Sequence, residues 1–111
     1  MKYTAMINFK AICEHGLDSE TDVYDWIILE YIRDWESSQR SVRVGHRVWI
    51  NLKHMVKSLP MVPVKTKSAA TKRLTKLRDL GLIDCDQGPD HRLYVCTTQR
   101  YEDVTMITGD F

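Results

Sequence analysis

The chain has 111 residues, of which 43% are hydrophobic and 28% charged, with sixteen Lys and Arg against fifteen Asp and Glu. This length predicts a single domain, 1–111, and the composition argues against wholesale disorder. No apolar run is long enough to cross a membrane and the N-terminus lacks a signal peptide's apolar core, so we expect a cytoplasmic protein. Three cysteines without a Cys-x-x-Cys pair argue against a disulfide framework and a cysteine-based zinc site.

The charges are separated along the chain. Residues 14–36 contain eight carboxylates and one basic residue, residues 37–78 contain eleven basic residues and no carboxylate, and acids return from Asp79 onward. A carboxylate-free basic segment attracts polyanions and is typical of nucleic-acid-binding domains. The alternative is a solvated face whose basic residues pair with the acidic segment before it.

The N-terminal part predicts a short strand at 6–9, one helical turn that Gly16 stops, and a long helix. Ser19 and Asp22 have the spacing of a capping box, so this helix is expected at 20–37. Its apolar residues cover more than one stripe, so it is either the central core helix or packs on two partners. A second copy of the chain would be the other partner, which makes helix 20–37 the candidate homodimer interface.

The middle of the chain predicts a strand or hairpin at 41–50 and then two helices. The alternation around Gly45 places four apolar side chains on one face: Val42, Val44, Val48 and Ile50. Asn51 is expected to cap a helix at 52–59, and Thr66 a helix at 67–80. Each helix has one apolar stripe, formed by Leu52, Met55, Val56 and Leu59 in the first and by Ala70, Leu74 and Leu77 in the second.

Two strand-like runs, 82–86 and 92–96, predict a C-terminal hairpin around a turn-rich link at 87–91. The tail, 97–111, is open to two interpretations. It is either a linker to a domain not present here or a strand or helix that packs on the first long helix.

A short helix, a turn and a second, basic helix predict a helix-turn-helix whose second helix enters the major groove of DNA. Its outward face combines basic residues with small hydroxyls. The candidates for base contacts are Ser68, Thr71, Lys72 and Thr75, and the candidates for phosphate contacts are Lys65, Lys67 and Lys76. Thr66, Lys53, Arg43, Arg47, His91 and Arg92 complete the predicted DNA-binding set.

Two stretches resemble a known fold. The pattern R-L-x-x-L-x-x-L-G-L-I at 73–83 resembles a winged-helix recognition helix running into the first wing strand, and 49–55 resembles the strand and cap before the preceding helix. The resemblance covers about residues 19–96. It implies an α+β winged helix, with a three-helix helix-turn-helix core, a C-terminal β-hairpin wing and a short N-terminal strand.

The N-terminal strand and the aromatic-rich first helix make the chain more similar to the DNA-binding domains of phage, plasmid and satellite replication initiators than to ordinary repressors. That similarity implies binding to repeated or palindromic origin elements in a bacterial or phage-infected cell, as one module of a longer chain. Two features depart from the common pattern. The link 60–65 is longer than a tight turn, and the wing carries Asp84, Asp86 and Asp90, which repel phosphates. Arg40, Arg43, His46 and Arg47 are therefore a rival backbone clamp.

The expected function is sequence-specific binding of double-stranded DNA by helix 67–80, in origin recognition, with no enzymatic activity, cofactor or metal. No histidine pair has a metal-ligand spacing and no glycine-rich phosphate loop is present. The same fold also fits a transcriptional regulator or the DNA-targeting module of a nuclease. An interpretation of another class is a protein-interaction winged helix whose basic face binds an acidic partner.

Overall fold

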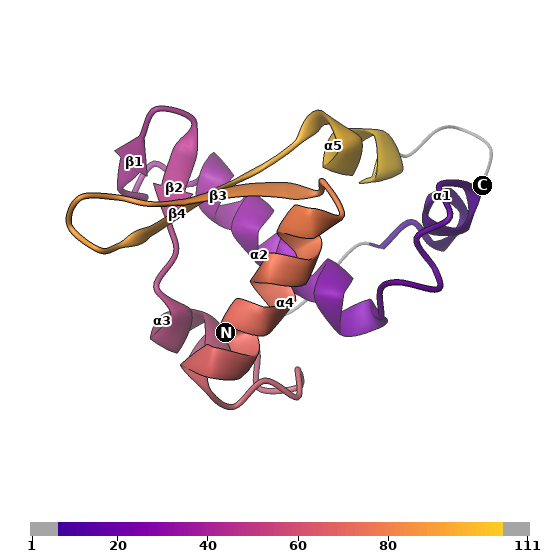
Figure 1. The fold of residues 1–111 in the computed structure, drawn as a ribbon, viewed down its shortest axis with the longest axis horizontal. Coiled ribbons are helices and arrows are strands. Elements are labelled where there is room, and N and C mark those ends of the chain that lie inside the picture. The colour runs from indigo at the N-terminus through magenta and orange to yellow at the C-terminus, as the bar shows by residue number, and fades with distance from the viewer. Residues whose placement is uncertain (1–6, 106–111) are drawn as a thin grey trace.

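The computed structural model describes residues 7–105, which form an α+β fold (Figure 1). This range contains five helices and one four-stranded antiparallel sheet. In chain order the elements are α1 (Phe9–Glu14), α2 (Val23–Ser37), β1 (Arg43–Val44), β2 (Arg47–Trp49), α3 (Leu52–Ser58), α4 (Lys67–Asp79), β3 (Ile83–Gln87), β4 (Leu93–Thr97) and α5 (Gln99–Thr105). None of these helices combines the length and apolarity that a membrane span requires.

The N-terminal strand predicted at 6–9 is wrong for every residue of it that the structure describes. Instead α1 begins at Phe9, because the Asn8 side chain caps it by accepting a hydrogen bond from the backbone N–H of Ala11 at 3.0 Å. Met6 lies outside the described residues. The short helix before Gly16 was predicted correctly, and Gly16 adopts the left-handed conformation (φ 71°) that ends it.

The start of the long helix also differs from the prediction. The capping box is formed by Asp22 and Asp25 rather than by Ser19, so α2 begins three residues later than expected. The Asp22 side chain accepts from the N–H of Asp25 at 2.9 Å, and the Asp25 side chain accepts from the N–H of Asp22 at 3.0 Å. These reciprocal bonds satisfy two backbone donors that a helix start leaves unpaired.

The strands are ordered β1-β2-β4-β3, so β2, which precedes α3 and α4, pairs with β4, which follows them. Strands β3 and β4 form the predicted C-terminal hairpin. In the first hairpin a two-residue turn, with Gly45 at φ 62°, places Val44 opposite Arg47 and Arg43 opposite Val48. Directly paired residues share a face, so Val44 and Val48 point to opposite sides.

The predicted common face of the four residues at 41–50 is therefore wrong. Val48 and Ile50 are buried in the core, whereas Val42 and Val44 are 44% and 55% exposed. The two-residue turn reverses which side of the hairpin the apolar residues after it occupy, and the sequence pattern alone does not specify the length of the turn.

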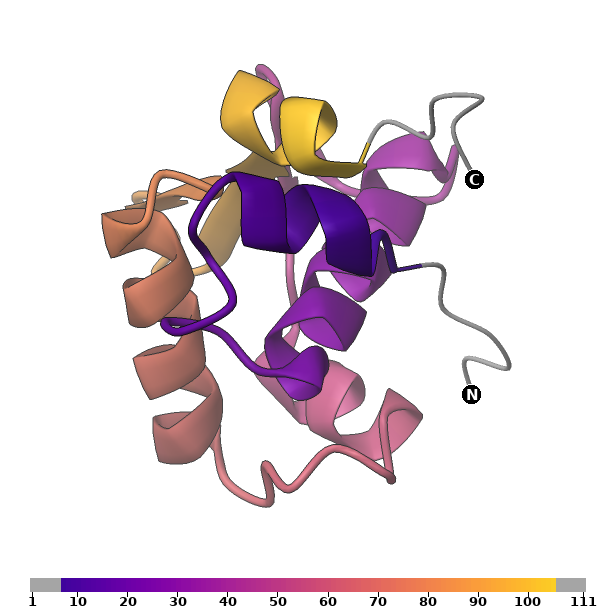
Figure 2. The ribbon, with the colours of Figure 1, turned by 90° about the vertical axis from the view of Figure 1, so that its right-hand side faces the viewer.

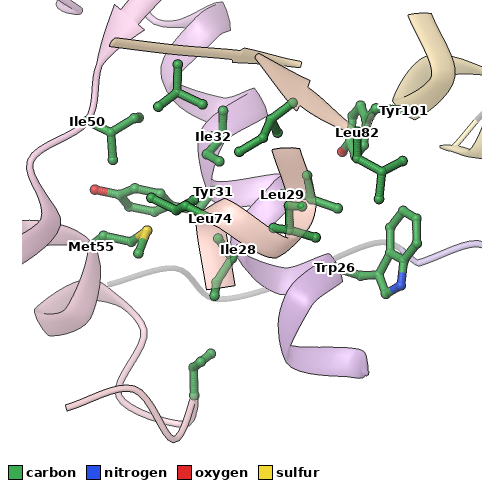
Figure 3. Close-up of a cluster of buried hydrophobic side chains, with 14 of the residues drawn as sticks. Trp26, Ile28, Leu29, Tyr31, Ile32, Ile50, Met55, Leu74, Leu82 and Tyr101 are labelled. Atoms are coloured by element: carbon green, nitrogen blue, oxygen red, sulfur yellow. The ribbon is translucent and has the colours of Figure 1, made fainter. Parts of the chain in front are cut away.

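The core lies between α2, α4 and the inner face of the sheet. Ile28, Leu29 and Ile32 of α2 are completely buried. Figure 3 shows the α2 side chains Trp26, Ile28, Leu29, Tyr31 and Ile32 together with Ile50, Met55, Leu74, Leu82 and Tyr101 from five other parts of the chain. The first of the two interpretations is thus correct, since α2 is the central core helix. Its role as a dimer interface stays a prediction.

The two helices of the middle segment were predicted closely. The Asn51 side chain accepts from the N–H of His54 at 3.1 Å and caps α3, and the Thr66 hydroxyl accepts from the N–H of Ala69 at 3.1 Å and caps α4. Their apolar stripes face inward, and Met55, Leu59, Ala70, Leu74 and Leu77 are buried. Gly81, at φ 77°, follows the end of α4 as expected.

Part of the tail forms a helix. α5 lies against α1 (Figure 2), and its residues Tyr101 and Val104 are buried. An ion pair between Arg33 and Glu102 joins α5 to α2, so the described part of the tail packs on the first long helix. Residues 106–111, which also belonged to the linker prediction, lie outside the described residues.

Candidate nucleic-acid interface

One side of α4 is exposed and carries the side chains predicted to contact DNA bases. Lys67, Ser68, Thr71 and Lys72 are exposed and Thr75 is half-buried. At about 100° per residue these five positions occupy one continuous arc, away from the buried stripe. In residues 7–105, no side chain pairs with Lys67, Ser68 or Lys72. The structure therefore brings these five candidates together on one open surface.

The hydroxyl groups on this surface differ in what they can offer a ligand. Thr71 Oγ1 donates to the carbonyl of Lys67 at 2.8 Å, so its remaining capacity is that of an acceptor. Thr66, predicted as a DNA contact, uses its hydroxyl oxygen to cap α4. That cap satisfies the N–H of Ala69 and leaves the first N–H groups of the helix without an intrahelical acceptor, a favourable environment for an anion.

A buried ionic cluster fixes α4 against the start of α2. Asp25 is completely buried, and its Oδ1 accepts from Arg73 at 2.9 Å while its Oδ2 accepts from Lys76 Nζ at 2.5 Å. Arg73 also donates to both oxygens of Asp22, at 2.9 and 3.0 Å. Together with the buried stripe of Ala70, Leu74 and Leu77, the cluster fixes the rotation of α4 about its own axis, and thereby which side chains it exposes.

The pKa of Asp22 reflects this environment. Partial burial acts to raise it, but the hydrogen bonds from Arg73 and from the backbone of Asp25 outweigh burial and hold the pKa below its usual value.

This cluster includes one of the predicted DNA-contact residues and adds residues that sequence reasoning missed. Lys76 was expected to bind phosphate, but it points toward α2 and is paired with Asp25. Arg73 and Asp25 were not singled out at all. A signal was present, because Asp25 is the one carboxylate inside the apolar run from Val23 to Leu29. Charged residues at such positions are almost always paired.

The alternative that the basic residues pair with the acidic segment before them is correct for two of the eleven, and two more pair with acids that follow the segment. Arg73 and Lys76 pair with the start of α2, whereas Arg47 and Arg78 pair with acids that follow the segment. The other seven have no carboxylate partner within residues 7–105: Arg40, Arg43, Lys53, Lys57, Lys65, Lys67 and Lys72. The unneutralised charge therefore belongs mainly to α3, α4 and the link between them.

Arg47 of β2 and Arg92, which directly precedes β4, both have partners within the protein. Arg47 lies 2.6 Å from Asp84 and 3.9 Å from Asp86. Arg92 lies 3.6 Å from Asp90, and its guanidinium stacks 4.2 Å from the centroid of the Trp49 ring.

The predicted DNA contacts outside α4 lie on several separate elements of the fold. Arg43 donates to the backbone carbonyls of Glu36 and Ser38. Lys53 is exposed on α3, Lys65 is exposed just before α4, and His91 is exposed in the β3–β4 turn. The acids next to Arg47 and Arg92 reduce the attraction of these two residues for phosphate, and in the case of Arg47 this weakens the rival clamp.

The β3–β4 turn depends on Gly88. A Cβ atom at this position would lie 2.6 Å from Cε2 of Tyr94, whose hydroxyl donates to Asp90 at 3.0 Å. We expect Gly88→Ala to lower the free energy of unfolding by about 1–3 kcal/mol, because the buried ring must move. Urea denaturation measures this cost. In a Tyr94→Ala background the cost of Gly88→Ala should shrink, and an unchanged cost would rule out the ring as its cause.

Within residues 7–105, no group of three or more His, Cys, Asp or Glu side chains is arranged to hold a metal ion. Comparison with protein-family models, with curated proteins and with solved structures finds no match for this chain.

Proposed function

We propose that the chain is a winged-helix domain that binds double-stranded DNA in a sequence-specific manner. The connectivity supports this proposal, because α2, the β1–β2 hairpin, α3, α4 and the β3–β4 hairpin follow one another, and β2 pairs with β4. In this interpretation α2, α3 and α4 are the three-helix core, β3 and β4 are the wing, and α4 is the recognition helix.

The observation that carries the proposal is the exposed side of α4. It combines unpaired lysines with short hydroxyl side chains, shows no carboxylate before Asp79, and is held in one orientation by the cluster at Asp25. Lysine and hydroxyl groups near the start of a helix are suited to the base edges of a major groove. Lys65 and Lys67, which are exposed at the start of α4, are the phosphate contacts that we propose, and such contacts would set the register.

Origin recognition in a mobile element remains the biological setting that we propose. The resemblance to replication initiators rested on an N-terminal strand and on an aromatic-rich first helix. The aromatic residues are present in α2, whereas α1 occupies the position of the strand from Phe9 onward. The setting is decided by the locus bound in the cell, an origin or a promoter.

The direct test is selection of duplexes from a random pool, followed by substitution of the α4 surface. Lys72→Ala and Thr71→Ala should each weaken binding to the selected duplex by about 1–3 kcal/mol and affect a scrambled duplex less. Lys10→Ala is a matched control, since it removes the same charge from the exposed surface of α1. Equal affinity of the unmodified protein for selected and scrambled duplexes would contradict base readout.

A further inference from the structure

The link between α3 and α4 is longer than a tight turn because it contributes its own anchors to the core. Val62 and Val64 are 3% and 4% exposed, and they line a small apolar niche with Ile28, Met55, Val56 and Leu59. Two backbone bonds tighten the link, from the N–H of Val62 to the carbonyl of Leu59 at 3.0 Å and from the N–H of Val64 to the carbonyl of Val62 at 2.7 Å. Pro60 and Pro63 further restrict the backbone. The link is therefore a rigid part of the fold.

This rigid link holds one large apolar side chain out in solvent. Met61 is 85% exposed, the highest value among the exposed large hydrophobic residues of the described chain. It lies between Leu59 and Val62, both of which are buried, so it cannot turn inward without displacing an anchor. A link that is held by buried anchors and presents an apolar side chain to water leaves that side chain available for an apolar contact with a partner.

The surroundings of Met61 are basic. The ammonium group of Lys65 lies 3.4 Å from the carbonyl oxygen of Pro60, whose carbon is bonded to the nitrogen of Met61. Lys57 and Lys67, on either side of the link, are exposed as well. The link, 59–66, which contains Met61, runs directly into the first turn of α4 and lies at the same end of the molecule as the start of that helix (Figures 1 and 2). Charge complementarity therefore favours a polyanion as the partner that covers this side chain.

We propose that Met61 contacts the DNA, by packing on the C5-methyl group of a thymine at the edge of the site bound by α4. This inference rests on the proposed function and adds a specificity-determining residue outside the recognition helix. The thymine methyl is the one apolar group that a base pair displays in the major groove. A methionine beside a basic helix start can reach it while the lysines contact the flanking phosphates, and its flexible chain adapts to the groove.

The test removes one apolar group at a time from each side of the contact. Replacement of each thymine in the selected duplex by deoxyuridine deletes only the methyl group. In the unmodified protein one position at the edge of the site should lose about fourfold in affinity. Met61→Ala should weaken binding to the thymine duplex by about fivefold to tenfold and should abolish the response to deoxyuridine at that position, while Met61→Leu should retain it.

Controls separate this inference from folding and from the proposed function. Met61→Ala should leave the thermal melting curve unchanged, because the side chain is exposed. Phe9→Ala removes another exposed hydrophobic residue, from α1, and should leave DNA affinity unchanged. If Met61→Ala binds like the unmodified protein, or if deoxyuridine costs both proteins the same, the methionine contact is overturned and DNA binding stands. If the unmodified protein binds no duplex at low salt, both proposals are overturned.

Discussion

Asp25→Ala is expected to lower the free energy of unfolding by about 2–4 kcal/mol, from about 1–3 kcal/mol for buried hydrogen-bond partners left unpaired and about 1 kcal/mol for the lost capping acceptor, measured by urea or thermal denaturation. The substitution leaves Arg73 and Lys76 without their buried acceptor, and these two residues are respectively 20% and 40% exposed at their side chains. It also removes the side-chain acceptor for the N–H of Asp22 at the start of α2. Arg73 keeps Asp22 as a partner, so the cost comes from Lys76, which loses its carboxylate, and from the hydrogen bonds that the buried Asp25 side chain no longer accepts.

Asp18→Ala provides the matched control, since it removes an exposed carboxylate from the loop before α2. Its effect should stay within about 0.5 kcal/mol, as for most surface substitutions. A loss below about 1 kcal/mol in Asp25→Ala would mean that the cluster is solvated and does not hold α4 in place. The orientation of the recognition surface would then need another explanation.

The parts of the fold that were predicted correctly are those decided by local chemistry. Asn51 and Thr66 cap the helices that follow them because each side chain reaches an N–H three residues onward, a contact that needs no distant partner. The apolar stripes of α3 and α4 follow from the helical period in the same way. At the start of α2, by contrast, both Ser19 and Asp22 fit a capping pattern. In the structure Asp22 is the cap, and its carboxylate also accepts a hydrogen bond from Arg73, which lies 51 residues away in the sequence.

For the candidate site, the sequence predicts correctly those α4 residues that are exposed whatever packs against the helix. Ser68 and Lys72 lie on the part of the exposed arc that faces away from the buried stripe, so packing of that stripe leaves them outside, and Lys67 and Thr71 are exposed in the first turns of the helix. Lys76 lies at the border of that arc, where a neighbouring helix determines whether it meets solvent or a carboxylate.

Contacts across the sheet were likewise not predictable from the sequence. The sequence does not specify that Arg47 would meet Asp84, 37 residues away, because their proximity depends on β4 joining β2 to β3.

Raising the salt concentration from 50 to 200 mM is expected to weaken duplex binding by about 10³-fold, the loss typical of a protein that makes about six phosphate contacts. This estimate fits the seven basic residues that have no carboxylate partner in the described chain. The measurement is a salt titration of affinity by fluorescence anisotropy, read as the slope of log K against log salt. Lys65→Ala should reduce the magnitude of that slope by about one.

Arg92→Ala is the informative comparison, because it removes the same formal charge from a residue that already lies beside Asp90 and stacks on Trp49. A slope unchanged in Arg92→Ala but reduced in Lys65→Ala would confine the phosphate contacts to the α3–α4 region and leave the wing outside them. Equal reductions would mean that the hairpin also reaches the DNA and that its acids do not prevent it. No measurable duplex binding at 50 mM salt would instead favour the interaction of this basic surface with an acidic protein, since counterion release is strongest at low salt.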